Sequence, residues 1–201
     1  MLEDLRSAPN LLTAFRFILV PILWIFASLG FSEIVGVGIL LGGLSDAFDG
    51  YLARRTGSVS EFGSKFDSIA DQFLQLSTIV WLFMLQPNIF SENSMLSLIA
   101  LATYLLSLVV GIVKFKRIAN LHLYLSKIVG FFLYIFVVHA FIIGRYNKVL
   151  FLLAFVGFIL SSSETFILQL ISKSVDEHMG SLFFAYLVKD HPIRKIVEKL
   201  P

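Results

Sequence analysis

The sequence lacks cysteine altogether and has few charged residues. None of its 201 residues is Cys, which excludes disulfide bonds and thiolate metal sites and leaves oxygen or imidazole ligands for any ion. Only 15% of the residues are Asp, Glu, Lys or Arg, whereas soluble domains carry about 25%. The formal net charge of +2 is too small to favour a nucleic-acid partner.

What the chain has in abundance is apolar sequence. Hydrophobic residues make up 57% of it, 21 residues are phenylalanine, and the mean hydropathy is +0.86. A helix needs about 20 apolar residues to cross a bilayer core of roughly 30 Å. Six segments have this length, at about 11–30, 34–53, 66–86, 95–114, 126–144 and 149–172. We therefore predict an all-α integral membrane protein with six transmembrane helices in one domain, residues 1–173.

Both ends of the chain are predicted to lie at the membrane surface. Within residues 1–9, Leu2 and Leu5 alternate with charged side chains, which favours a short interfacial helix. No small-residue cleavage site follows the first apolar segment, so we expect that segment to be retained. The tail, residues 174–201, has an apolar run too short to span a bilayer and is expected to be interfacial.

Basic residues fall on one side of this layout. Of the 16 Lys and Arg residues, all but Arg145 and Lys148 lie on the side of the two termini and of the connections 54–66 and 114–127. Membrane proteins concentrate basic residues on the cytoplasmic side. We expect a protein of the cell (inner) membrane, with both termini and these two connections in the cytoplasm.

Four aspartates interrupt the apolar sequence near the cytoplasmic ends of the second and third predicted spans. Asp46 and Asp49 are spaced i and i+3, and Asp67 and Asp71 are spaced i and i+4, so each pair shares one helix face. The short connection between the spans predicts an antiparallel hairpin in which the two pairs meet. An acid at the centre of a membrane helix costs about 2.5–3.5 kcal/mol on insertion scales, which makes a functional role the default interpretation.

Four converging carboxylates carry four negative charges, which two divalent cations would neutralise. An all-oxygen ligand set favours Mg²⁺ or Mn²⁺ over Zn²⁺. Gly50, Ala53 and Gly63 lie on the same faces as the acids and leave a slot beside them, and Arg54 is placed to hold an anion such as a diphosphate. A single Asp is often only a helix cap, and small residues spaced by four often only pack helices together. In combination, these features indicate phosphoryl chemistry.

The stretch from Asp46 to Asp71 reads D-x2-D-G-x2-A-R-x8-G-x3-D-x3-D. At every fixed position it resembles the signature of the CDP-alcohol phosphotransferase family, and the six-span layout is similar too. The resemblance implies that an alcohol hydroxyl displaces CMP from a CDP-linked lipid such as CDP-diacylglycerol, in a homodimeric enzyme. It further implies roles for individual residues: metal binding by Asp46, Asp49 and Asp67, a general base that also approaches the second ion at Asp71, and a cytidine diphosphate site lined by Gly50, Ala53, Arg54 and Gly63.

The acceptor alcohol is less well defined by the sequence. The stretches PNLLTAFRFILVPIL and GGLSDAFDGYLARR resemble phosphatidylglycerophosphate synthases, which implies glycerol 3-phosphate. Those enzymes commonly have Lys where this chain has Gln72, and KFKRIANLHLYLSK resembles members with other acceptors, so inositol phosphate and serine stay open. Candidates for binding an acceptor phosphate are Arg16, Lys114, Arg117 and Lys127. Snorkelling is the alternative for Arg16, and the positive-inside bias is the alternative for the others.

Two other classes of function compete with the transferase. A small cation transporter would also use intramembrane carboxylates, but it predicts acids near the midplane of several spans. A membrane scaffold without catalytic activity would not depend on the aspartates at all.

Overall fold

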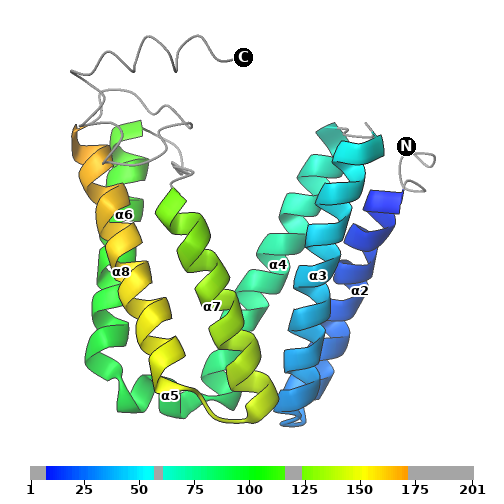
Figure 1. The fold of residues 1–201 in the computed structure, drawn as a ribbon, viewed down its shortest axis with the longest axis horizontal. Helices are drawn as coiled ribbons and strands as arrows, with labels where there is room; N and C mark the ends of the chain where they lie inside the picture. Colours follow the sequence, from blue (N-terminus) through cyan, green and yellow to red (C-terminus); the bar gives the residue numbers. More distant parts are fainter. Residues whose placement is uncertain (1–7, 57–60, 116–123, 172–201) are drawn as a thin grey trace. The chain divides into compact units, whose positions relative to one another are not determined.

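The computed structural model describes residues 8–56, 61–115 and 124–171, which form seven helices (Figure 1). They are α2 (Ala8–Ser28), α3 (Ser32–Thr56), α4 (Glu61–Leu85), α5 (Pro87–Glu92), α6 (Ser94–Phe115), α7 (Tyr124–Ile143) and α8 (Lys148–Ile171). The six long helices match the six predicted segments to within a few residues. The short α5 lies in the connection between the predicted segments 66–86 and 95–114, where the sequence analysis expects no helix. The interfacial helix expected at residues 1–9 lies mostly, and the tail 174–201 entirely, outside the described residues.

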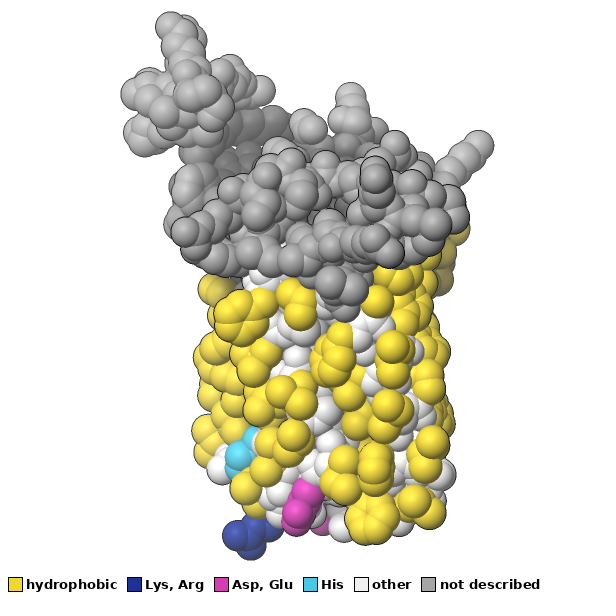
Figure 2. All heavy atoms as spheres, turned by 90° about the vertical axis from the view of Figure 1, so that its right-hand side faces the viewer, with side chains coloured by type: hydrophobic (Ala, Val, Ile, Leu, Met, Phe, Trp, Pro, Cys, Tyr) yellow, Lys and Arg dark blue, Asp and Glu magenta, His cyan; other side chains and the backbone are white. Residues whose placement is uncertain are grey.

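Four of the described helices are long and apolar enough to cross a membrane. The spans are Phe66–Leu85, Ser94–Lys114, Leu125–Ile143 and Lys148–Ile171, and Leu12–Ser28 forms a shorter apolar helix. The charge-bearing α3 is not among them. In Figure 2, hydrophobic side chains cover the middle of the face on which α2 and α3 lie. The described residues are thus all-helical and compatible with a membrane protein. Their length and hydropathy support four spans, and six spans stay a prediction.

The residues group into two compact units. Unit 1 comprises Met1–Glu92 and Val137–Asn147, and unit 2 comprises Asn93–Phe136 and Lys148–Pro201. The described part of unit 1 therefore holds α2 to α5 and the C-terminal end of α7, and that of unit 2 holds α6, α8 and the rest of α7. The single domain expected over residues 1–173 stays a prediction.

Helix α2 is the central element of unit 1. It packs extensively against both α3 and α4, which contact each other much less. Its buried side chains Val20, Leu23 and Ala27 recur at the three- and four-residue spacing of one helix face. On α4, the buried residues Ala70, Leu74, Ser77 and Trp81 repeat the same spacing. With these faces buried, α2 packs against both α3 and α4.

A glycine turn brings α3 back alongside α2. Gly30 has a φ of 83°, in the left-handed region that glycine adopts without strain. The N–H of Phe31 donates to the carbonyl of Phe26, and the N–H of Gly30 to that of Ala27, both over 3.0 Å. This is the Schellman pattern, which satisfies the last carbonyls of a helix while ending it. The turn is therefore short enough for α2 and α3 to pack along their lengths.

Unit 2 is built mainly on the contact between α6 and α8. Its apolar core includes the fully buried Phe136 of α7, whose ring lies edge-to-face with the rings of Phe151 and Phe155 of α8, with centroids 5.8 and 6.0 Å apart. Such aromatic pairs add to the stabilisation from area burial. At the other end of α8, the Lys114 ammonium of α6 donates to the carbonyls of Gln169 and Leu170 over 2.8 and 2.7 Å.

Candidate active site

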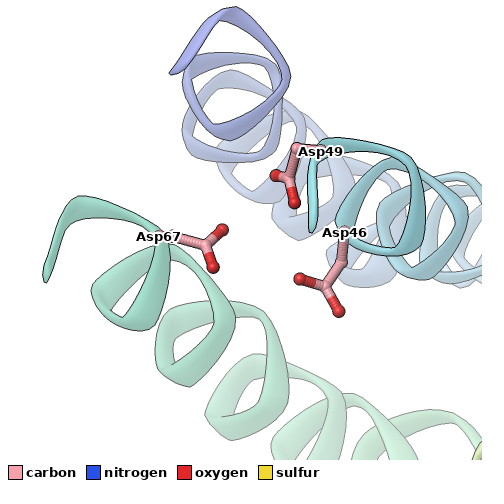
Figure 3. Close-up of side chains that lie close together, drawn as sticks. All are labelled: Asp46, Asp49 and Asp67. Atoms are coloured by element: carbon pink, nitrogen blue, oxygen red, sulfur yellow. The ribbon is translucent and has the colours of Figure 1, made fainter. Parts of the chain in front are cut away.

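Three aspartates converge in the space between α3 and α4 of unit 1. Asp46 and Asp49 extend from α3 and Asp67 from α4, with their carboxylates turned toward one another (Figure 3). One oxygen of each lies within 4.8 Å of the others. The side chain of Asp49 is only 5% exposed, whereas those of Asp46 and Asp67 are 48% and 34% exposed. The group is thus buried on one side and open to small ligands on the other.

The guanidinium of Arg16, from α2, lies among all four aspartates. Its Nη1 donates to Oδ1 of Asp46 over 3.2 Å and to Oδ1 of Asp71. Its Nη2 donates to Oδ2 of Asp49 over 2.5 Å and to Oδ1 of Asp67. The Arg16 side chain has no exposed surface. Asp71 therefore joins the other acids through a shared arginine, and three helices contribute to the cluster instead of the two in the predicted hairpin.

Thr13, one turn before Arg16, adds a second contact from α2. Its Oγ1 donates to Oδ2 of Asp49 over 3.5 Å, and the residue is 2% exposed. A hydroxyl on a buried carboxylate holds its orientation and offsets part of the cost of burying its charge. Asp49 is thus the most firmly positioned acid of the cluster.

Aromatic contacts hold α2 against α4 near the cluster and beyond it. The rings of Phe17 and Phe66 stack with centroids 4.8 Å apart, one residue from Arg16 and Asp67 respectively. Further along, the indole N–H of Trp24 donates to Oγ of Ser77 over 3.0 Å, and its ring meets Trp81 edge-to-face at 5.7 Å. These contacts fix the register of the two helices, and with it the reach of Arg16 to the acids of α4.

The donor chemistry of the cluster fits a hard divalent cation. The four aspartates offer only carboxylate oxygens as ligands, and such a donor set suits Mg²⁺ or Mn²⁺. Four carboxylates and one guanidinium leave a formal charge of −3 when all are ionised, so Arg16 neutralises only part of the cluster. Asp46, Asp49 and Asp67 are the three described residues whose oxygens are close enough together to hold one ion.

The remaining predicted site residues are spread over both units. Gly50, Ala53 and Arg54 lie on the last turns of α3 and Gly63 on the first turn of α4, and the side chains of Ala53 and Arg54 lie outside the described part of the chain. Lys114 and Lys127 belong to unit 2, and both are exposed. Arg117 lies outside the described residues. Among the acceptor-phosphate candidates, Arg16 belongs to the same unit as the aspartates and contacts them.

The sequence interpretation missed the pairing of Arg16 with the acids and the part played by Thr13. A signal for both was present in α2. Thr13 and Arg16 continue the buried spacing of Val20, Leu23 and Ala27 by further steps of three and four residues. Two polar residues in register with a core face are predicted to point inward, and inside this bundle the acids were the available partners.

The described fold and site define an all-helical membrane protein with a carboxylate cluster suited to a cation. The family model of the CDP-alcohol phosphatidyltransferases matches residues 6–172. The chain belongs to this family.

Shorter segments are similar to individual members. Over 73 residues the chain is 36% identical to the CDP-diacylglycerol–glycerol-3-phosphate 3-phosphatidyltransferase of Rickettsia typhi, covering 35% of this chain and 41% of that protein. Over 71 residues it is 41% identical to the protein of that name from Salmonella choleraesuis, covering 34% and 39%. An uncharacterised protein of Aquifex aeolicus is 41% identical over 66 residues, which are 33% of this chain and 34% of that one. The chain thus spans about two fifths of the length of the named relatives.

Proposed function

We propose that this protein is a metal-dependent phosphatidyltransferase that moves the phosphatidyl group of CDP-diacylglycerol to glycerol 3-phosphate and releases CMP. The observation that carries the proposal is the convergence of Asp46, Asp49 and Asp67 beside Asp71, within a chain of the CDP-alcohol phosphatidyltransferase family. The names of the Rickettsia and Salmonella relatives support the choice of donor and acceptor. Inositol phosphate and serine are the alternative acceptors.

The reaction needs one proton transfer and one exchange of P–O bonds. Asp71 accepts the proton of the acceptor hydroxyl while the hydroxyl oxygen attacks the phosphatidyl phosphorus. The bond from that phosphorus to the bridging oxygen breaks, and the bridging oxygen leaves on CMP. Two divalent ions, held by Asp46, Asp49, Asp67 and Asp71, would supply charge neutralisation at the diphosphate. No atom changes its oxidation state. The oxygen that leaves on CMP keeps the electron pair of the broken P–O bond as negative charge.

Residues around the acids would hold the nucleotide. We assign the diphosphate to Arg54, because a guanidinium binds phosphate through two parallel hydrogen bonds. Gly50, Ala53 and Gly63 would line the cytidine diphosphate site, where small residues leave room beside the carboxylates. Arg16, Lys114, Arg117 and Lys127 remain candidates for the acceptor's phosphate.

The location follows from the distribution of basic residues. We assign the protein to the inner membrane as a homodimer whose subunits each have six spans. The aspartates are assigned to the cytoplasmic side, because the basic residues lie on that side. There a lipid with a water-soluble nucleotide head group can keep its tails between helices while CMP departs into water.

The test is CMP release by the purified full-length protein. Liposomes containing CDP-diacylglycerol are offered glycerol 3-phosphate, inositol phosphate or serine, each with Mg²⁺, Mn²⁺ or EDTA. We expect turnover with glycerol 3-phosphate that EDTA abolishes, and a loss of about 10²–10⁴-fold in Asp71→Asn, the range for removing a general base.

Glu33→Gln is the matched control, since Glu33 is an exposed acid at the opposite end of α3 from Asp46 and Asp49. It should retain full turnover. Absence of CMP release with every acceptor and both metals would overturn the proposal. Metal-ion flux into the same liposomes without CMP release would instead favour a cation transporter.

A further inference from the structure

The position of Arg16 raises a question that the transferase reaction does not answer. A buried arginine in an apolar helix is costly unless it is paired, and Arg16 is paired with four carboxylates at once. Asp46, Asp49 and Asp67 are also the residues whose oxygens are close enough together for a metal ion. The acids that pair with Arg16 therefore include the three whose geometry suits a metal ion.

The guanidinium and an ion need the same space. Nη2 of Arg16 contacts both Oδ2 of Asp49, at 2.5 Å, and Oδ1 of Asp67. A divalent ion binds carboxylate oxygens at about 2.0–2.6 Å, so an ion bridging these two oxygens would fall where Nη2 lies. Repulsion between like charges would add to this overlap. One cation is thus expected to exclude the other from the oxygens that they share.

Arg16 itself is incompletely satisfied in this position. Its Nε is buried and has no hydrogen-bond partner among the described residues. A buried donor without a partner carries a desolvation cost that a satisfied one does not. When all four carboxylates are ionised, the cluster also keeps a formal charge of −3 around a single guanidinium, which attracts further cations. Both features favour replacement of the guanidinium when a divalent ion is present.

We propose that Arg16 is the resident counter-cation of the acid cluster, which holds the carboxylates together in the metal-free protein and is displaced by divalent ions that take the same oxygens. This deepens the proposed function, because it rests on metal binding by the aspartates. Arg16 is accordingly a positioning residue. Its removal should leave a cluster that binds metal more tightly but is less stable without metal.

The test measures metal binding without any lipid substrate. Mn²⁺ binding to the detergent-purified full-length protein is followed by titration calorimetry and by the Mn²⁺ EPR signal, in wild type, Arg16→Met and Arg16→Lys. Arg145→Gln is the control, because it removes an exposed positive charge of unit 1 that no described interaction links to the aspartates. Thermal unfolding with and without Mn²⁺ is recorded on the same samples.

Competition predicts that Arg16→Met binds Mn²⁺ about 5–150-fold more tightly than wild type, the usual range for coupled ligands. Its metal-free unfolding temperature should fall, and Mn²⁺ should raise that temperature by more than it does in wild type. Arg145→Gln should match wild type in both measurements. An affinity that is equal or weaker in a folded Arg16→Met would overturn the inference.

Two further results keep the test decisive. If Arg16→Met does not fold, ¹⁵N-arginine NMR of wild type replaces it, with the Arg16 signals assigned by comparison with Arg16→Lys. The guanidinium signals of Arg16 should shift when Mg²⁺ is added. Unchanged signals at saturating Mg²⁺ would overturn the inference. If wild type and every variant bind no Mn²⁺, metal dependence of the proposed function fails as well. Equal binding in wild type and Arg16→Met rejects the competition alone.

Discussion

Nη2 of Arg16 lies 2.5 Å from Oδ2 of Asp49, a residue 33 positions further along the chain. This contact joins α2 to α3, and the parallel contact of the same nitrogen with Asp67 joins α2 to α4. The acid cluster therefore depends on the first described helix as much as on the two helices that carry the aspartates. Substitutions in all three helices test this arrangement.

Neutralising Asp49 and neutralising Asp46 should have the same effect on activity but different effects on stability. Each change, Asp→Asn, removes a proposed metal ligand and should lower CMP release by more than the 10–100-fold typical of lost outer contacts. Asp49 is 5% exposed and paired with a buried arginine, so breaking that pair destabilises by up to about 3–5 kcal/mol, less any relief of repulsion between acids. Asp46 is 48% exposed, and such pairs contribute about 0–1 kcal/mol.

The measurement is metal-free thermal unfolding, followed by the fluorescence of Trp24 and Trp81. Asp49→Asn should unfold at a clearly lower temperature than Asp46→Asn, which should stay close to wild type. The reverse order would mean that Asp49 is not the anchoring acid of the cluster.

Much of unit 1 could be predicted from spacing alone. The i, i+3 and i, i+4 pairs placed the aspartates on single faces, and the apolar segments located the long helices. The contribution of α2 was not predicted, because an arginine in a first span is equally consistent with snorkelling to the lipid head groups. Its true partners lie 30 to 55 residues away, and single-sequence periodicity carries no information about which helix faces which.

The short α5 was missed for a different reason. Its sequence, PNIFSE, begins with a proline and contains polar residues typical of a turn. Proline is also favoured in the first turn of a helix, where its missing N–H costs nothing. Ile89 is buried in the folded protein, which favours the helix over a turn. Because this burial is a tertiary contact, the local sequence pattern does not reveal it.

Removing the Thr13 hydroxyl should weaken the site without dismantling it. Thr13→Val keeps the shape of the side chain but loses the hydrogen bond to Asp49. Lost outer contacts to a metal ligand cost about 10–100-fold in affinity or activity, and the 3.5 Å length of this bond places the expected loss of Mn²⁺ affinity at the lower end. Thr13→Ser retains the hydroxyl and should bind Mn²⁺ like wild type. A Thr13→Val protein with unchanged affinity would show that Asp49 needs no support from Thr13.

Lys114 offers a direct choice between a binding role and a structural one. Its ammonium donates to two carbonyls near the C-terminal end of α8, where a positive charge stabilises a helix by about 0.3–1 kcal/mol. Lys114→Met should therefore lower the unfolding temperature while leaving the KM for glycerol 3-phosphate unchanged. Lys127→Met, at an exposed position of α7, is the comparison and should leave the unfolding temperature unchanged. A raised KM in Lys114→Met with normal stability would assign Lys114 to the acceptor instead.

A methyl group at Gly36 should destabilise unit 1. A Cβ there would lie 2.8 Å from Cβ of Phe141 and 2.9 Å from the backbone nitrogen of Ile142, both on the end of α7 that belongs to this unit. Backbone cannot move aside as a flexible side chain does, so overpacking at Gly36→Ala should cost about 1–3 kcal/mol. Gly130→Ala is the matched control, because a Cβ at that helical position meets nothing within 4 Å, and the higher helix propensity of alanine should stabilise slightly. Thermal unfolding of the two variants should therefore shift in opposite directions, and a Gly36→Ala protein as stable as Gly130→Ala would show that α3 and the end of α7 are not packed closely in the folded protein.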